Sequence, residues 1–102
     1  MRKFESGEFM VHFKHELHPE DPITKYLYII KDIARDSSKD KWNEDTGEGY
    51  IVTYKNVLTG IVWARPYPEF ISEVDHDKYP DIAMKYRCSR CDALGNIIGD
   101  GE

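Results

Sequence analysis

Cys88 and Cys91, in the sequence CSRC, have the spacing with which two thiolates bind one zinc ion in a tight turn. A tetrahedral site needs four ligands, and without a second cysteine pair His76, another histidine or a second chain would have to complete it. A thioredoxin-like redox role is disfavoured because the motif does not open a helix after a strand. We therefore expect reduced thiols in a flexible tail, and we predict no metal and no cofactor.

Three histidines recur at every third position, at His12, His15 and His18. Side chains alternate along a strand, so a strand would point His15 away from the other two. A helix would bring all three to one side, but Pro19 and Pro22 follow directly and disfavour a helix. Solvated or packed histidines are therefore favoured over a metal triad.

Candidate catalytic groups are few. Ser37 follows Asp36 in a polar loop, with no strand-to-helix elbow or oxyanion hole to activate it, so ordinary turn chemistry is the better interpretation. The carboxylates of residues 69–77 are typical of a solvated acidic face, and no glycine-rich phosphate loop is present. We predict no catalytic residue and no enzyme.

Aromatic and cationic side chains gather in a second group. On the segment of residues 61–65, alternation places Val62 and Ala64 on one face, expected to point inward, and Trp63 and Arg65 on the other. An outward indole beside a guanidinium is typical of recognition, although Trp63 could instead cap the barrel under the turn at residues 66–70. The candidate ligand-binding residues are Arg35, Tyr54, Trp63, Arg65 and Tyr67.

Short β-prone segments must position these residues. Strands are predicted at residues 9–13 and 26–35, and the alternation of the second slips near Lys31 and Asp32, which indicates a bulge. Residues 50–55 and 61–65 predict a hairpin around Asn56 and Gly60.

Less regular segments surround these strands. Residues 69–74 predict a one-turn helix with Phe70 and Val74 pointing inward, and residues 76–87 remain undecided between helix and strand. Loop insertions are expected near residues 15–25 and 36–48. The predicted organisation is one mainly β domain over residues 1–87, a small barrel of about five strands with a short helical turn, followed by an irregular, flexible C-terminal extension at residues 88–102.

Several patches stand in an order that resembles a family of small bacterial and phage proteins, the domain of unknown function numbered sixteen fifty-three. The patches are HFK (12–14), IARDS (33–37), VTY (52–54), WARPYPEF (63–70), KYP (78–80) and KYR (85–87). The resemblance implies an SH3-like barrel and no assigned activity. The sequence departs from the family pattern at residues 15–25, in the acidic loop near Trp42, at Asp36 where a histidine is frequent, and in the CSRC tail.

Composition limits the partners. The chain has 102 residues, 40% of them hydrophobic, and a net charge of −5, which disfavours duplex nucleic acid and anionic membranes. No apolar run approaches the roughly 20 residues that cross a bilayer, and the N-terminus lacks the apolar stretch of a secretion signal, so we expect a cytoplasmic protein.

The sequence therefore favours a non-catalytic interaction module that binds a protein or peptide segment through an aromatic and arginine groove. An alternative is a single-stranded nucleic-acid binder, in which bases stack on tyrosine and tryptophan while Arg35, Lys55 and Arg65 meet phosphates. A third possibility is an enzyme or zinc-dependent module that uses the cysteine pair.

Overall fold

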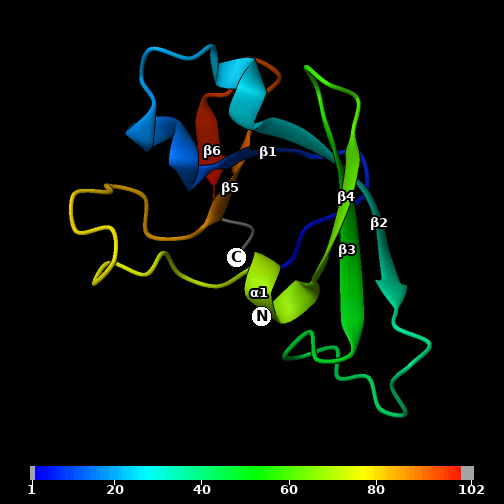
Figure 1. Ribbon diagram of the computed structural model, residues 1–102. Coiled ribbons are helices and arrows are strands. Elements are labelled where there is room, and N and C mark those ends of the chain that lie inside the picture. The colour runs from blue at the N-terminus through cyan, green and yellow to red at the C-terminus, as the bar shows by residue number, and fades with distance from the viewer. Residues whose placement is uncertain (1, 100–102) are drawn as a thin grey trace.

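The computed structural model describes residues 2–99, which form a mainly β structure with little helix. Six strands make one antiparallel sheet in the order β4-β3-β2-β1-β5-β6, and within these residues the edge strands β4 and β6 do not pair with each other (Figure 1). The strands are β1 Phe9–His12, β2 Leu27–Arg35, β3 Tyr50–Asn56, β4 Val62–Pro66, β5 Cys88–Cys91 and β6 Ile97–Gly99. The mainly β prediction is confirmed, with an open sheet of six strands.

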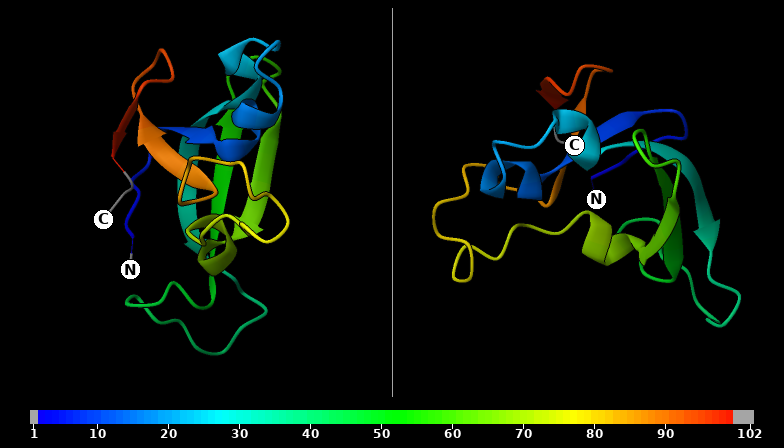
Figure 2. Two further views of the ribbon diagram at one scale, coloured as in Figure 1. Left: turned by 90° about the vertical axis from the view of Figure 1, so that its left-hand side faces the viewer. Right: turned by 45° about the horizontal axis from the view of Figure 1, so that its top comes forward.

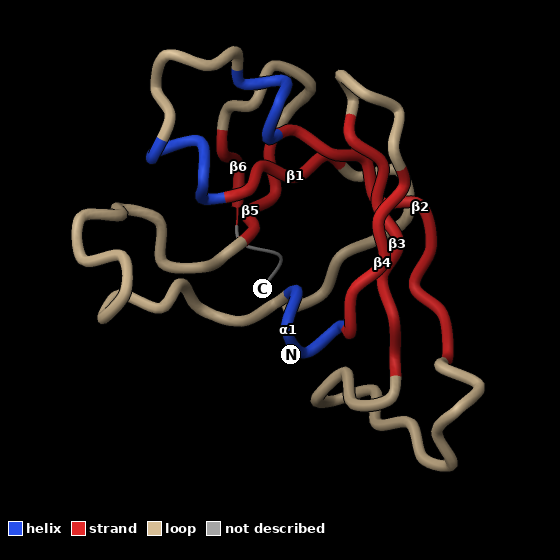
Figure 3. The backbone as a smooth tube through the Cα atoms, in the orientation of Figure 1, coloured by secondary structure: helices blue, strands red, loops and turns tan. Residues whose placement is uncertain are grey.

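The bulge predicted in the second strand is present. Ile30 of β2 pairs with Tyr54 of β3, but Asp32 pairs with the adjacent Thr53, so Lys31 is an extra residue without a partner. Because side chains alternate along a strand, this extra residue brings Ile33 to the face that already holds Ile30. We call this the inner face of the sheet, and Figure 3 shows β2 running from the β1 half into the β3 half.

The sheet has a hydrophobic cluster on each side. Met10, Ile30 and Val52 pack on the inner face under the one-turn helix α1 (Tyr67–Phe70), whereas Val11 belongs to a cluster on the outer face. Strand β1 is therefore buried on both sides and forms the centre of the fold. The predicted inward positions of Phe70 and Val74 are confirmed, with Phe70 in the inner cluster and Val74 in the outer one.

The outer cluster is covered by two irregular segments. One contains the 3-10 helices η1 (Phe13–Leu17) and η2 (Ile23–Tyr26), in the region predicted as a loop insertion. The other is the undecided segment of residues 76–87, which contributes the buried side chains of Ile82 and Met84. Glu16 joins the two segments, because its two carboxylate oxygens accept the backbone N–H groups of Ala83 and Met84, at 2.8 and 2.9 Å. Figure 2 shows the backbones of these segments side by side.

The expectation of an irregular C-terminal extension is wrong for residues 88–99. Strand β5 pairs with β1 along its whole length, Cys88 opposite His12 and Cys91 opposite Phe9, and β6 adds a further strand. The sheet thus continues past the boundary expected at residue 87, because β1 needs a second neighbour to satisfy its backbone hydrogen bonds. Residues 100–102 of the expected tail lie outside the described residues.

The β3–β4 hairpin is confirmed, and Asn56 organises its turn. The Asn56 side-chain oxygen accepts the N–H groups of Leu58 and Thr59, both at 2.9 Å, and its amide donates to the carbonyl of Lys25 at 3.0 Å. The residue is 3% exposed, so these bonds are made away from water. Asn56 therefore ties the hairpin turn to the segment that precedes β2.

The Asn56→Ala variant should lower the free energy of unfolding by about 2–3 kcal/mol, because it leaves buried backbone groups without partners. Asn43→Ala is the matched control: Asn43 accepts the N–H groups of Asp45 and Thr46 in the same way, but it is exposed, and its loss should cost under about 1 kcal/mol. Urea unfolding of both variants measures the difference. Equal losses would contradict the role given to Asn56.

Candidate functional site

Trp63 and Arg65 lie together on the edge strand β4. Trp63 pairs with Tyr54 and Arg65 pairs with Val52, so both side chains belong to the inner face. Trp63 is 52% exposed, and within residues 2–99 its indole makes no hydrogen bond or ring contact. The alternative in which Trp63 is a buried cap of the barrel is therefore wrong, and the indole is available to a ligand.

The expectation that Val62 and Ala64 point into the core is wrong. Both are exposed on the outer side of β4, although the predicted alternation itself is correct. The reason is the register of the hairpin: Val62 pairs with Lys55 and Ala64 pairs with Thr53, and both of these β3 side chains lie on the outer face. The core side of β4 is covered only at its Pro66 end, where α1 begins, so the Trp63 end of the same face stays open to solvent.

Tyr54 is the cross-strand neighbour of Trp63. Its ring packs edge-on against Tyr28, with centroids 5.3 Å apart, and at a tilt against Phe70, with centroids 5.4 Å apart. Tyr54 is therefore held rigidly by the core on one side and borders Trp63 on the other. These contacts make Tyr54 a structural neighbour of the exposed indole.

Tyr67 and Arg35, two of the five predicted ligand residues, do not join this surface. Tyr67 is only 2% exposed, and its hydroxyl accepts the Phe4 N–H at 3.0 Å and donates to the Arg2 carbonyl at 3.1 Å. Arg35 pairs with Tyr50, four residues or about 13 Å along β3 from Tyr54, and its guanidinium lies 5.0 Å from the Trp42 ring. The structure therefore brings Tyr54, Trp63 and Arg65 together and leaves Tyr67 and Arg35 apart from them.

Three cations from different parts of the chain act on one histidine, His12 of β1. Arg87, Lys14 and Arg65 all lie close enough to His12 to lower the pKa of its imidazole electrostatically. Arg87 precedes β5 and is fixed by backbone hydrogen bonds with Phe13 and Ser72. We use the name cationic face for the side chains of Tyr54, Trp63 and Arg65 together with Lys14 and Arg87, the two cations that share His12 as a neighbour with Arg65. The cationic face is locally basic on a chain of net charge −5.

His12 is held neutral inside this cationic region. Its Nδ1 accepts the Lys14 N–H at 3.2 Å, so it caps η1 and carries no proton on that nitrogen. Burial, followed by the charge of Arg87, lowers the His12 pKa from 6.5 to about 3. His12 thus stays uncharged at neutral pH, and the positive charge of the cationic face comes from arginine and lysine.

Arg65 has one weak partner. A carboxylate oxygen of Glu69, one turn further on, lies 3.7 Å from the Arg65 guanidinium, and both side chains are substantially exposed. Exposed ion pairs of this kind contribute little to stability, about 0–1 kcal/mol. The pair can therefore open at small cost, and an incoming carboxylate can replace Glu69 on Arg65.

The cysteine pair is not assembled as a metal or redox site. Cys88 belongs to the inner cluster and Cys91 to the outer one, because residues three apart on a strand point to opposite faces. Burial raises the pKa of Cys88 to about 12 and that of Cys91 to about 11, so both are neutral thiols. The prediction of free thiols is confirmed, but they lie in the core and not in a tail.

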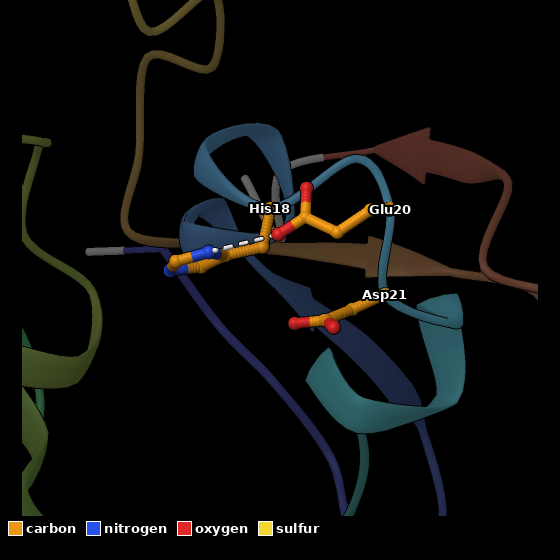
Figure 4. Close-up of side chains that lie close together, drawn as sticks. All are labelled: His18, Glu20 and Asp21. Atoms are coloured by element: carbon orange, nitrogen blue, oxygen red, sulfur yellow. Dashed lines mark ion pairs between the residues drawn. The ribbon is translucent and has the colours of Figure 1, made fainter.

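One group of potential metal ligands occurs among the described residues. The ligand atoms of His18, Glu20 and Asp21 lie within 4.8 Å of one another, and His18 Nδ1 is 3.4 Å from Glu20 (Figure 4). His18 and Glu20 are exposed, and the Asp21 carboxylate already accepts hydrogen bonds from Lys25 at 3.1 Å and Tyr26 at 2.8 Å. His12 and His15 are not members, so the histidine repeat does not form a shared site.

Comparisons of the chain with protein-family models, with curated proteins and with solved structures find no match. The resemblance to the family numbered sixteen fifty-three therefore stays a prediction. Within residues 2–99, no helix combines the length and the apolar character required to cross a membrane.

The basic neighbours of Arg65 were missed by sequence reasoning. Lys14, His12 and Arg87 are far from Arg65 along the chain: the pairing of β1 with β5 brings Arg87 to His12, and Arg65 acts on the same histidine from β4, three strands away in the sheet. In the sequence, the HFK patch begins at the last residue of β1 and the KYR patch directly precedes β5. Neither patch reveals the pairing of the two strands.

His12 should make stability depend on pH. Its pKa is lower in the folded chain than in the unfolded one, so its contribution is complete above about pH 6.5 and is lost as pH falls towards 3. Between pH 7 and 5, the wild type should lose about 1–2 kcal/mol more unfolding free energy than His12→Asn, which keeps a capping oxygen but cannot titrate. Urea unfolding at both pH values measures this, and parallel losses would contradict it.

The two thiols should be nearly inert in the folded protein. With raised pKa values of about 12 and 11, their thiolate fractions at pH 8 are small, so a disulfide reagent should label them at least about 100-fold more slowly than in urea. Cys88→Ser and Cys91→Ser assign the rates to each thiol. Fast labelling of the native protein, or one zinc ion per purified chain, would contradict this account.

Proposed function

We propose that this protein is a non-catalytic interaction module, and that its cationic face binds an extended, acidic segment of a partner protein. The observation that carries the proposal is the half-exposed indole of Trp63 beside Arg65 on an edge strand. Tryptophan and arginine are among the residues most enriched in the positions that contribute most to protein–protein binding. The positive charges of Lys14 and Arg87 nearby select an acidic ligand on a chain that is otherwise acidic.

The edge position of β4 supports an extended ligand. Asn56 N–H donates to the Ile61 carbonyl at 2.9 Å, and bonded and non-bonded pairs alternate along an antiparallel ladder, so the backbone groups of Val62 and Ala64 face away from β3. These groups are available to a further strand. In that position a ligand's side chains can reach Trp63 and Arg65 on the inner face, and a ligand carboxylate can displace Glu69 from Arg65.

A peptide is favoured over single-stranded nucleic acid by the distribution of charge. Lys55 alternates with Tyr54 and points to the outer face, while Arg35 is two strands away from Arg65 and its guanidinium lies against the Trp42 ring, so neither forms one phosphate track with Arg65. The net charge of −5 repels a long phosphate backbone but tolerates a short acidic peptide held by three cations.

We also propose that the open sheet is a form of the SH3-like barrel, and that the chain is a cytoplasmic relative of the family numbered sixteen fifty-three. Support comes from the bulge in β2, which lets one strand contribute to both halves of a curved sheet (Figure 3). The short helix α1 at the end of β4 packs against the inner face between these halves.

Affinity capture from lysate of the native host, with wild type and variants immobilised in parallel, tests the binding surface. Trp63→Ala and Arg65→Ala should each reduce recovery of the specific partner by about tenfold or more, the loss expected when a central interface side chain is truncated. Val62→Ala is the matched control, because it truncates the same strand on the outer face, and it should recover the partner normally. Glu69→Gln should increase recovery, because it removes the internal competitor for Arg65.

The same experiment distinguishes the ways in which the proposal can fail. Recovery of the same proteins by all four variants, or loss of the captured material after nuclease treatment, would contradict peptide binding at the cationic face. Ala64→Pro removes an N–H that faces solvent in the free protein, so it should weaken binding only if the ligand adds a strand to β4. Circular dichroism of each variant establishes that it is folded.

A further inference from the structure

A cavity of about 250 Å³ lies at the other end of the inner face from Trp63. It is bounded by the N-terminal residues 3–5, by β2 at Ile33, by the acidic loop at Glu44 and Gly47, and by Tyr50 and Tyr67. We call this cavity the loop pocket. Figure 1 shows the loop that joins the lower ends of β2 and β3, and the lining residues Glu44 and Gly47 belong to this loop.

The walls of the loop pocket are mainly aromatic and apolar. Phe4, Ile33, Tyr50 and Tyr67 line it, and Ile33 is 38% exposed although it lies on the core side of β2. The Tyr67 hydroxyl is already bonded to the backbone of residues 2 and 4, so what it contributes to the pocket is the ring. These walls therefore favour a small ligand with an apolar surface.

The polar backbone of the wall is also satisfied internally. Gly47 is buried with a φ of 80°, its N–H donates to the Asn43 carbonyl at 2.8 Å, and its own carbonyl accepts from Tyr50 N–H at 3.1 Å. A ligand that needs directed hydrogen bonds gains none from these groups. The remaining polar groups of the pocket are the Tyr50 hydroxyl and the charged side chains of Lys3, Glu5 and Glu44.

The charges favour a cation. Glu5 and Glu44 stand against Lys3, and within residues 2–99 none of the three is in an ion pair. The loop of residues 36–48 that supplies Glu44 holds five acidic residues and two lysines, so its field is negative. Aromatic faces attract cations as well, because their quadrupoles present negative charge.

We infer that the loop pocket binds an alkylated ammonium group, such as a quaternary ammonium on a short carbon chain. A group of this kind has an apolar surface that fits the aromatic and isoleucine wall, carries the positive charge that Glu5 and Glu44 attract, and donates no hydrogen bond. A primary ammonium is strongly hydrated, and in a pocket with apolar walls it would lose water hydrogen bonds without gaining equivalent ones from the protein. An anion is disfavoured, because the pocket has two carboxylates, Glu5 and Glu44, and only one lysine, Lys3.

Titration of the full-length protein with choline and with 3,3-dimethylbutan-1-ol, followed by amide chemical shifts, tests this inference. The two probes have the same shape and differ in the charged nitrogen. Choline should bind with a dissociation constant at least about threefold lower than that of the neutral alcohol, and shifts should cluster at Ile33, Gly47 and Tyr50. Equal binding of the two probes, or no saturable binding of choline, would overturn the inference.

Charge variants test the same site independently. Glu44→Gln should weaken choline binding about threefold or more and leave the neutral alcohol unaffected, whereas Lys3→Met should strengthen choline binding. Glu48→Gln removes the same charge from the same loop outside the pocket lining, and it should change choline binding by less than Glu44→Gln does. Equal effects of the two glutamine variants, or saturable binding of inorganic phosphate that depends on Lys3, would contradict a specific cation site.

Discussion

One extra residue in β2 determines which side chains share the inner face. Before Lys31 the inner residues of β2 are Tyr28 and Ile30, and after it they are Ile33 and Arg35, because the bulge shifts the register against β3 by one position. Without the shift, Ile33 would point outward and the inner face would lose its apolar side chain near Tyr50. The core beneath α1, the setting of Tyr54 and the wall of the loop pocket all depend on this local irregularity.

The second constraint is the burial of β1 on both sides. It explains why the CSRC motif, which resembles a metal-binding pair of cysteines, has a structural role. Strand β5 completes β1, so its side chains must enter both clusters, and small apolar groups are required there. Cysteine behaves as a small hydrophobic residue when it is buried and protonated. Two cysteines with two residues between them can bind one metal ion when they lie in a turn. On a strand the same separation places the two thiols on opposite faces.

Local signals in the sequence were sufficient for the elements whose partners are close along the chain. The alternation slip at Lys31, the hairpin around Asn56 and the inward position of Phe70 could all be predicted, because each is encoded within about ten residues. Strand β5 could not, since nothing near Cys88 reveals that its partner is β1 at the opposite end of the chain. The separation of Tyr67 from Trp63 could not be predicted for the same reason: the burial of Tyr67 depends on Phe4 and Arg2, more than sixty residues away.

The two candidate binding surfaces share one wall, the helix α1. Its Phe70 ring packs against Tyr54 of the cationic face, and its Tyr67 ring lines the loop pocket. The centroids of the Phe70 and Tyr67 rings are 6.2 Å apart. A ligand that shifts Tyr67 would therefore press on Phe70, because a close-packed interior transmits small displacements rather than absorbing them. The opposite charges of the two surfaces follow from their sources: basic residues beside the paired strands β1 and β5, and acidic residues in the loop between β2 and β3. Placing α1 between them keeps the two sets of charges apart, so that each surface can select its own ligand.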